Sequence, residues 1–215
     1  MDKFSFNTIK DFDTHISKSI PNYVDLSYTV GKMASYFIKG NNVVDIGCST
    51  GKLLDSLSSA FAAKYYGYDI SQNLIGSECN NKNVVFIVND VTTAGFPDNT
   101  DLFLSLFTLQ FTKPDNRQQI IKRMYDALND TGALIISEKC YENNGFVQDL
   151  YTFTYYDYKR EAFTPEEIFN KQHDLRSIMR PFSPEENKRI LYSAGFKTIE
   201  TFWQSLNFRA WVCIK

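Results

Sequence analysis

The sequence predicts an α/β fold in which a mostly parallel sheet carries helices on both faces. Three observations support this prediction. Short apolar runs alternate along the chain with stretches of helical periodicity. A turn containing two glycines joins the first predicted strand to the helix that follows it. Residues 198–214 alternate in polarity, which predicts that the sheet ends in an antiparallel hairpin.

The predicted elements follow one another in this order. Strands are expected at residues 43–46, 64–69, 84–88, 102–107 and 133–137, and the hairpin at 198–204 and 207–214. Helices are expected at residues 24–39, 52–63, 71–79, 115–128 and 184–194, with N-caps at Ser71 and Asp115. Residues 1–20 are expected to form an arm or short helices. Residues 144–180 are expected to form a helical insertion, in which Thr164 and Pro165 start a helix.

Composition indicates one folded domain over residues 1–215. The chain is 43% hydrophobic, which excludes a disordered protein, and its formal charge of −2 supplies no bulk basic field for nucleic acid. Cys48, Cys79, Cys140 and Cys213 are widely spaced, as reduced thiols are, and form no C-x-x-C pair that would indicate a disulfide framework or a zinc site. No signal peptide or membrane span is visible, so a cytoplasmic location is expected. The spacing of the cysteines leads us to expect no metal.

The loop after the first strand predicts a nucleotide-like ligand. Residues 43–46 form an apolar strand with Asp45 near its end, and Gly47 and Gly51 follow. Such a loop lets a ligand approach bare backbone at the start of a helix. The spacing fits neither the dinucleotide fingerprint nor the P-loop, because a third glycine is missing and Leu53 follows Lys52. It resembles the first motif of class I S-adenosylmethionine-dependent methyltransferases, which have a Rossmann-like fold; an ordinary strand–turn–helix corner is the alternative.

Three further residues end consecutive predicted strands. Asp69 can accept hydrogen bonds from ribose hydroxyls, Asp90 can accept one from an adenine amino group, and Phe107 would lie beside the reactive end of the cofactor. Each could instead be a turn residue, a helix cap or a core residue. Together with the Gly47 loop, they favour S-adenosylmethionine as the cofactor.

The expected chemistry needs little acid–base machinery, because a sulfonium methyl group is already an activated electrophile. No catalytic residue can therefore be named. Glu138, Lys139 and Arg160 are expected near the rim of the active site, and a role as structural salt-bridge partners explains them equally well. His15 and His173 are isolated in the sequence and are interpreted as surface or structural residues.

The helical insertion is rich in aromatic residues and arginine. Candidate contacts to a small-molecule or nucleotide acceptor, in the insertion and just beyond it, are Tyr151, Tyr155, Arg160, Arg180 and Arg189. A packed lid or a dimer interface explains the same composition equally well.

Several stretches resemble one subfamily, the carboxy-S-adenosyl-L-methionine synthases of the tRNA wobble-uridine modification pathway. The matching stretches are residues 15–23, 45–49, 107–111, 132–139, 157–160 and 194–196. The resemblance runs from about residue 12 to the end of the chain. It implies an S-adenosylmethionine pocket, conversion of S-adenosylmethionine and prephenate into a carboxylated sulfonium, and a homodimer paired through the insertion. The pocket residues that it implies are Tyr23, Gly47, Cys48, Ser49, Asp69, Ile70, Asp90 and Val91. The glycine loop and the strand ends add Asp45, Gly51 and Phe107 to the residues predicted to bind the cofactor.

The sequence departs from this family at two positions. Leu106 stands where the family has an asparagine, and Ile190 stands where we align the arginine that holds the new carboxylate, with Arg189 one residue early. The sequence therefore favours a methyltransferase that uses plain S-adenosylmethionine and an unidentified acceptor. A true carboxy-S-adenosyl-L-methionine synthase and a non-catalytic cofactor-binding or partner-binding module are the alternatives.

Overall fold

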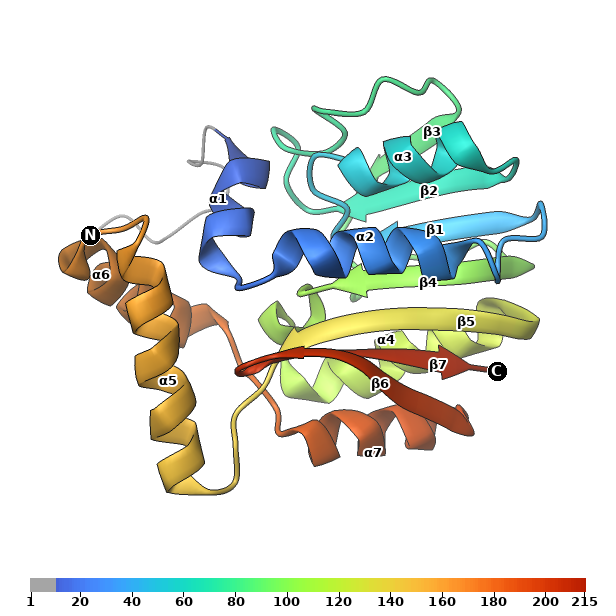
Figure 1. Cartoon of the computed structure of the whole chain (residues 1–215). Helices are drawn as coiled ribbons and strands as arrows, with labels where there is room; N and C mark the ends of the chain where they lie inside the picture. Colours follow the sequence, from blue (N-terminus) through green and yellow to red (C-terminus); the bar gives the residue numbers. More distant parts are fainter. Residues whose placement is uncertain (1–10) are drawn as a thin grey trace.

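The computed structural model describes residues 11–215, and these form a seven-stranded sheet of order β3-β2-β1-β4-β5-β7-β6 (Figure 1). The strands are β1 (Asn42–Ile46), β2 (Lys64–Asp69), β3 (Val84–Val88), β4 (Thr100–Leu106), β5 (Leu128–Lys139), β6 (Thr198–Ser205) and β7 (Phe208–Ile214). Strands β1 to β5 pair in parallel, and β7 lies antiparallel between β5 and β6. The predicted parallel sheet with a terminal hairpin is confirmed.

Helices cover both faces of this sheet. One face packs against α2 (Tyr23–Ala34) and α3 (Lys52–Ala60), and the other against α4 (Pro114–Ala127) and α7 (Pro184–Ala194). Neighbouring residues of β1 point to opposite faces: Val43 belongs to the apolar cluster with α2 and α3, and Val44 to the cluster with α4 and α7. Burial on both faces explains why the middle residues of β1 and β4 are mostly apolar.

Three helices lie at the edge where the parallel strands end. These are α1 (Phe12–Ser19), α5 (Gly145–Arg160) and α6 (Pro165–Ile178), which stand beyond the carboxyl ends of the strands in Figure 1. Tyr155 and Tyr158 of α5 donate hydrogen bonds to the Ser19 and Ser17 carbonyls, at 2.9 and 3.1 Å. The insertion is therefore fastened to the N-terminal helix at the edge where α/β sheets bind ligands.

The helix expected at residues 71–79 is wrong. This segment forms successive turns, and Gly76 has a left-handed φ of +69°. The backbone N–H groups of Gly76 and Glu78 donate to the carbonyls of Ser49 and Thr50, both at 2.9 Å. Backbone hydrogen bonds that would have built a helix instead fasten this segment to the glycine loop.

Helix boundaries differ from the predictions in two further places. α2 ends at Ala34, because Tyr36 and Phe37 bond to carbonyls three residues back and tighten the last turn. α4 has Lys113 rather than Asp115 at its N-cap, and Asp115 lies in the first turn.

The helix starts at Thr164 and Ser183 are confirmed, since both residues form capping boxes, at the starts of α6 and α7. The turn expected at residues 129–132 is wrong: these residues form a bulge inside β5, since Thr100 pairs with Leu128 and Leu102 with Ala133. Residues 1–10 of the expected arm lie outside the described residues, and no helix in residues 11–215 is long and apolar enough to cross a membrane.

Candidate cofactor site

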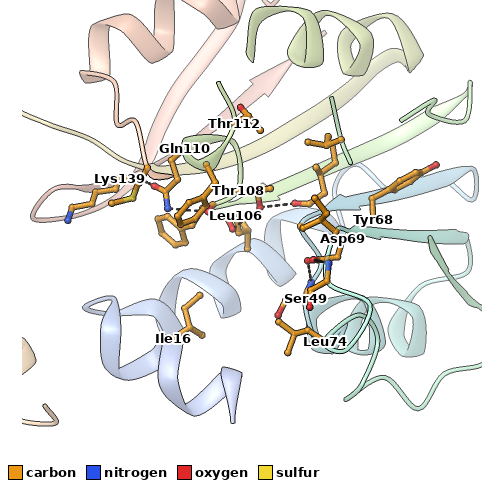
Figure 2. A pocket seen from close by; sticks show the side chains of 18 of the residues that line it. Ile16, Ser49, Tyr68, Asp69, Leu74, Leu106, Thr108, Gln110, Thr112 and Lys139 are labelled. Atoms are coloured by element: carbon orange, nitrogen blue, oxygen red, sulfur yellow. Dashed lines mark hydrogen bonds between the residues drawn. The ribbon is translucent and has the colours of Figure 1, made fainter. Parts of the chain in front are cut away.

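A cavity of about 850 Å³ opens at the carboxyl ends of β1, β2, β4 and β5. Residues of α1, α5 and α6 cover it. Figure 2 shows Asp69, Ser49 and Leu74 on one side of the cavity and Lys139 on the other, with Leu106 and Thr108 between them. Of the residues predicted to bind the cofactor, Gly47, Ser49, Asp69, Ile70, Asp90, Val91 and Phe107 line the cavity.

The Gly47 loop is held in shape by its backbone. The N–H groups of Gly47 and Cys48 both donate to the Tyr68 carbonyl, at 2.7 and 3.1 Å. Gly47 has a φ of +72°, and a Cβ at this position would clash with the Thr108 side chain, whose hydroxyl donates to the Ile46 carbonyl at 2.9 Å. Only glycine combines this conformation with this close approach.

Asp69 joins the loop to the segment after β2. Its Oδ2 accepts the Ser49 N–H at 2.9 Å and its Oδ1 accepts the Ser71 N–H at 2.8 Å. Each carboxylate oxygen has a further lone pair, so both loop support and ribose binding are compatible with this position. The Ser49 hydroxyl is buried and has no hydrogen-bond partner among residues 11–215, which fits a loop that holds a polar ligand.

The next strand end offers an apolar surface and an acceptor. Asp90 lines the cavity and its Oδ1 accepts the Thr92 N–H at 2.8 Å. Ile70 and Val91 also line the cavity, and Ile70 is 73% exposed despite its apolar side chain. An acceptor beside apolar side chains suits a flat, aromatic base.

Phe107 adopts a strained conformation at the middle of the cavity. Its φ is +59°, and its N–H donates to the Ser137 carbonyl at 2.7 Å. Its ring packs against Phe208 and Tyr23, with centroids 5.7 and 6.3 Å away. Non-glycine residues in this region cluster at functional sites, because the surrounding structure must hold them there.

Four other residues predicted to bind the cofactor do not line the cavity: Tyr23, Asp45, Cys48 and Gly51. Tyr23 packs on Phe107. Asp45 is buried, and burial together with the charge of Asp69 raises its pKa to about 7. These residues support the loop from beneath.

Cys48 and Gly51 also lie behind the loop. Burial raises the pKa of the Cys48 thiol, and its sulfur lies close to Gly67, on the side away from the cavity. Gly51 is the N-cap of α3, with a φ of +78° and the Phe86 ring close by. Both residues serve packing of the strand–loop–helix unit.

Of the predicted acceptor contacts, Tyr155 lines this cavity and Arg180 lines a second cavity beside it. Tyr151, Arg160 and Arg189 line neither. Arg160 and Arg189 are exposed and pair with carboxylates of their own helices, Asp157 at 3.8 Å and Glu186 at 3.9 Å. Their expected role at the site is therefore not supported by their positions.

Ile190 also lies away from the cavity. It packs against the apolar cluster under α4 and α7, on one face of the sheet. Neither residue 189 nor residue 190 is thus placed to hold a carboxylate in this chain's cavity.

The basic end of the cavity was only partly predicted from the sequence. His15, Lys139 and Lys171 line it; Lys139 was expected near the rim of the site, whereas His15 was interpreted as isolated. Burial and the charges of Lys171 and Lys159 lower the pKa of His15 to about 4, so its ring is neutral and accepts a hydrogen bond from Lys171. Lys139 ends β5, where ligands of α/β sheets bind.

The chain is similar to known proteins over nearly its whole length. Residues 43–132 match the family model described as a methyltransferase domain. The chain is 35% identical to the carboxy-S-adenosyl-L-methionine synthase of Staphylococcus epidermidis over 98% of this chain and 95% of that protein. It is 30% identical to the enzyme of the same name from Methylococcus capsulatus, over 100% of this chain and 95% of that protein.

A solved structure shows the same fold. Phosphoethanolamine N-methyltransferase 2 of Haemonchus contortus, in complex with S-adenosyl-L-methionine, has a TM-score of 0.69 and 15% identity, over 98% of this chain and 59% of that one. The fold is that of the S-adenosylmethionine-dependent methyltransferases, and S-adenosylmethionine is the cofactor.

Replacing Asp69→Ala should weaken binding of S-adenosylhomocysteine by about 30-fold, because the Ser49 and Ser71 N–H groups lose their acceptor and the loop loses its shape. Isothermal titration calorimetry measures this, with Asp149→Ala on the exposed surface of α5 as the matched control. Unchanged affinity in the Asp69 variant would remove this residue from the account of the site.

Proposed function

Because the chain belongs to the carboxy-S-adenosyl-L-methionine synthase family and is an S-adenosylmethionine-dependent transferase, we propose that it synthesises carboxy-S-adenosyl-L-methionine. The co-substrate would be prephenate, as the family resemblance implies. The product would serve tRNA wobble-uridine modification. The chain's own contribution is to bind and orient the two reactants, because the methyl carbon of the cofactor is already activated by its sulfonium.

One observation carries this proposal. The cavity does not end at Phe107 but continues to a basic end lined by Lys139, Lys171 and His15. Plain S-adenosylmethionine would place a positive sulfonium in the middle of the cavity, and the lysine ammonium groups beyond it offer nothing favourable to a cation. A carboxylated sulfonium, or an acid that supplies the carboxyl group, brings a negative charge that the Lys139 ammonium attracts.

The position aligned with the family's arginine lies outside this chain's own cavity. Ile190 stands there with Arg189 beside it, and both lie on α7, away from the cofactor cavity. Cations on β5 and α6 supply positive charge to the cavity instead.

Methyl transfer to a small-molecule or nucleotide acceptor is the second candidate, and Leu106 favours it. Leu106 lines the cavity beside Phe107, at the position where the family resemblance expects an asparagine (Figure 2). An apolar side chain there removes a hydrogen-bonding group from the reaction centre.

Incubation of the protein with S-adenosylmethionine and prephenate, followed by mass spectrometry, separates the two candidates. We expect the cofactor to gain a carboxyl group, and omission of prephenate to prevent the gain. An unchanged cofactor would exclude the synthase and leave methyl transfer or a non-catalytic binding module; calorimetry with S-adenosylmethionine and S-adenosylhomocysteine then tests the module.

We also propose that two copies pair through the insertion. Phe146, Leu150 and Phe153 are 78%, 50% and 66% exposed, and their spacing places them on one side of α5. An apolar row of this kind on a helix surface is typical of an interface.

Sedimentation velocity should show a dimer for the unmodified chain. The double variant Phe146→Asp, Phe153→Asp should sediment as a monomer, because two charges would be buried without partners in the interface. Tyr192→Asp, which changes an exposed aromatic residue on α7, is the control and should leave the dimer intact. A monomer for the unmodified chain would contradict the pairing.

A further inference from the structure

Lys139 lies where the cofactor cavity meets a second cavity of about 540 Å³. The second cavity lies between the end of β5, α5 and α6, and its wall includes two arginines, Arg176 and Arg180, and one carboxylate, Glu186 at the start of α7. The residues that line both cavities are Lys139, Tyr155, Leu175 and Met179. The Lys139 ammonium can therefore contact a ligand in either cavity.

Aromatic rings hold two lysines at this junction. The ammonium groups of Lys139 and Lys159 lie 4.9 and 5.5 Å from the centre of the Tyr155 ring. Lys139 also lies 5.6 Å from the Phe208 ring, and Lys159 lies 5.5 Å from the Phe163 ring. Cation–π contacts of this kind fix the position of an ammonium without neutralising its charge.

Among residues 11–215, neither of these two ammonium groups has an acidic partner. Within residues 11–215, no carboxylate forms an ion pair with Lys139 or Lys159, and neither ammonium donates a hydrogen bond to a protein group. Lys159 is only 4% exposed. A buried charge without a partner is costly, so a lysine in such a place indicates that another molecule supplies the opposite charge.

The pKa values agree with this geometry. Burial and the charge of Lys159 lower the pKa of Lys139 to about 8, and burial lowers the pKa of Lys159. Burial and Lys159 also lower the pKa of Lys171 to about 8. Positive charge is thus disfavoured when the cavity is empty, and an anion would reverse this.

We propose that Lys139 binds a carboxylate at the junction of the two cavities, and that Lys159 strengthens this carboxylate subsite with its charge. The inference rests on the proposed synthase function and names the residues that hold its acidic group. The carboxylate belongs either to the acid co-substrate in the second cavity or to the carboxylated cofactor in the first. In both cases the subsite places the carboxyl carbon near the reactive end of the cofactor.

The test measures binding rather than turnover. Dissociation constants of carboxy-S-adenosyl-L-methionine, prephenate and S-adenosylhomocysteine are determined by calorimetry for the unmodified chain and three variants. Lys139→Met keeps the aliphatic stem and removes the charge. Lys159→Met leaves the cavity wall intact and serves as the second variant. Lys122→Met, at an exposed lysine paired with Asp126 on α4, is the matched control.

We expect Lys139→Met to weaken binding of a carboxylated ligand by about 30-fold and Lys159→Met by about fivefold. S-adenosylhomocysteine should bind all variants equally. The melting temperature of ligand-free Lys139→Met should not fall, because the variant removes an unpaired charge, whereas a structural lysine would lower it. Loss of affinity for prephenate alone assigns the subsite to the co-substrate, and loss for the carboxylated cofactor alone assigns it to the product.

The proposal would be overturned if Lys139→Met and Lys159→Met bound both carboxylated ligands as tightly as the unmodified chain does. Failure of the unmodified chain to bind either carboxylated ligand would also overturn it. Failure of the proposed function is a separate outcome. If no carboxylated cofactor forms in the incubation described above but the Lys139 variant still loses carboxylate binding, the subsite stands and serves another acid.

Discussion

The site depends on one carboxylate at the end of β2. Asp69 accepts the Ser49 and Ser71 N–H groups with its two oxygens and so fixes the glycine loop to the next segment of the chain. The loop in turn makes the helix expected after Asp69 impossible, because the Ser49 and Thr50 carbonyls bind the N–H groups of Gly76 and Glu78. A single carboxylate at a strand end therefore shapes the nucleoside side of the cavity through its hydrogen bonds to backbone N–H groups.

The sequence was sufficient to predict this side of the cavity, because its residues end parallel strands at known spacing. Asp69, Asp90 and Phe107 follow apolar runs, and the sheet brings the ends of those runs together. The basic side could be predicted only in part, since of its members Lys139 alone ends a strand. Its members come from α1, β5, α5 and α6, and only the packing of the insertion over the strand ends brings His15 and Lys159 near Lys139.

The two departures from the family differ in where they lie. Ile190 is on α7 and does not line the cofactor cavity of this chain. Leu106, in contrast, does line the cavity and is a real departure at its centre. The chain thus combines an altered reaction centre with a basic far end, and the charge of that end favours a carboxylated ligand.

The central claim is that this cavity binds a carboxylated form of S-adenosylmethionine. Cells that express the chain contain plain S-adenosylmethionine and S-adenosylhomocysteine, so the protein has a choice of ligands while it folds. Mass spectrometry of the small molecule released from the purified, denatured protein tests this choice directly. We expect the mass of carboxy-S-adenosyl-L-methionine. Finding only S-adenosylmethionine or S-adenosylhomocysteine would contradict the claim that the cavity binds a carboxylated cofactor.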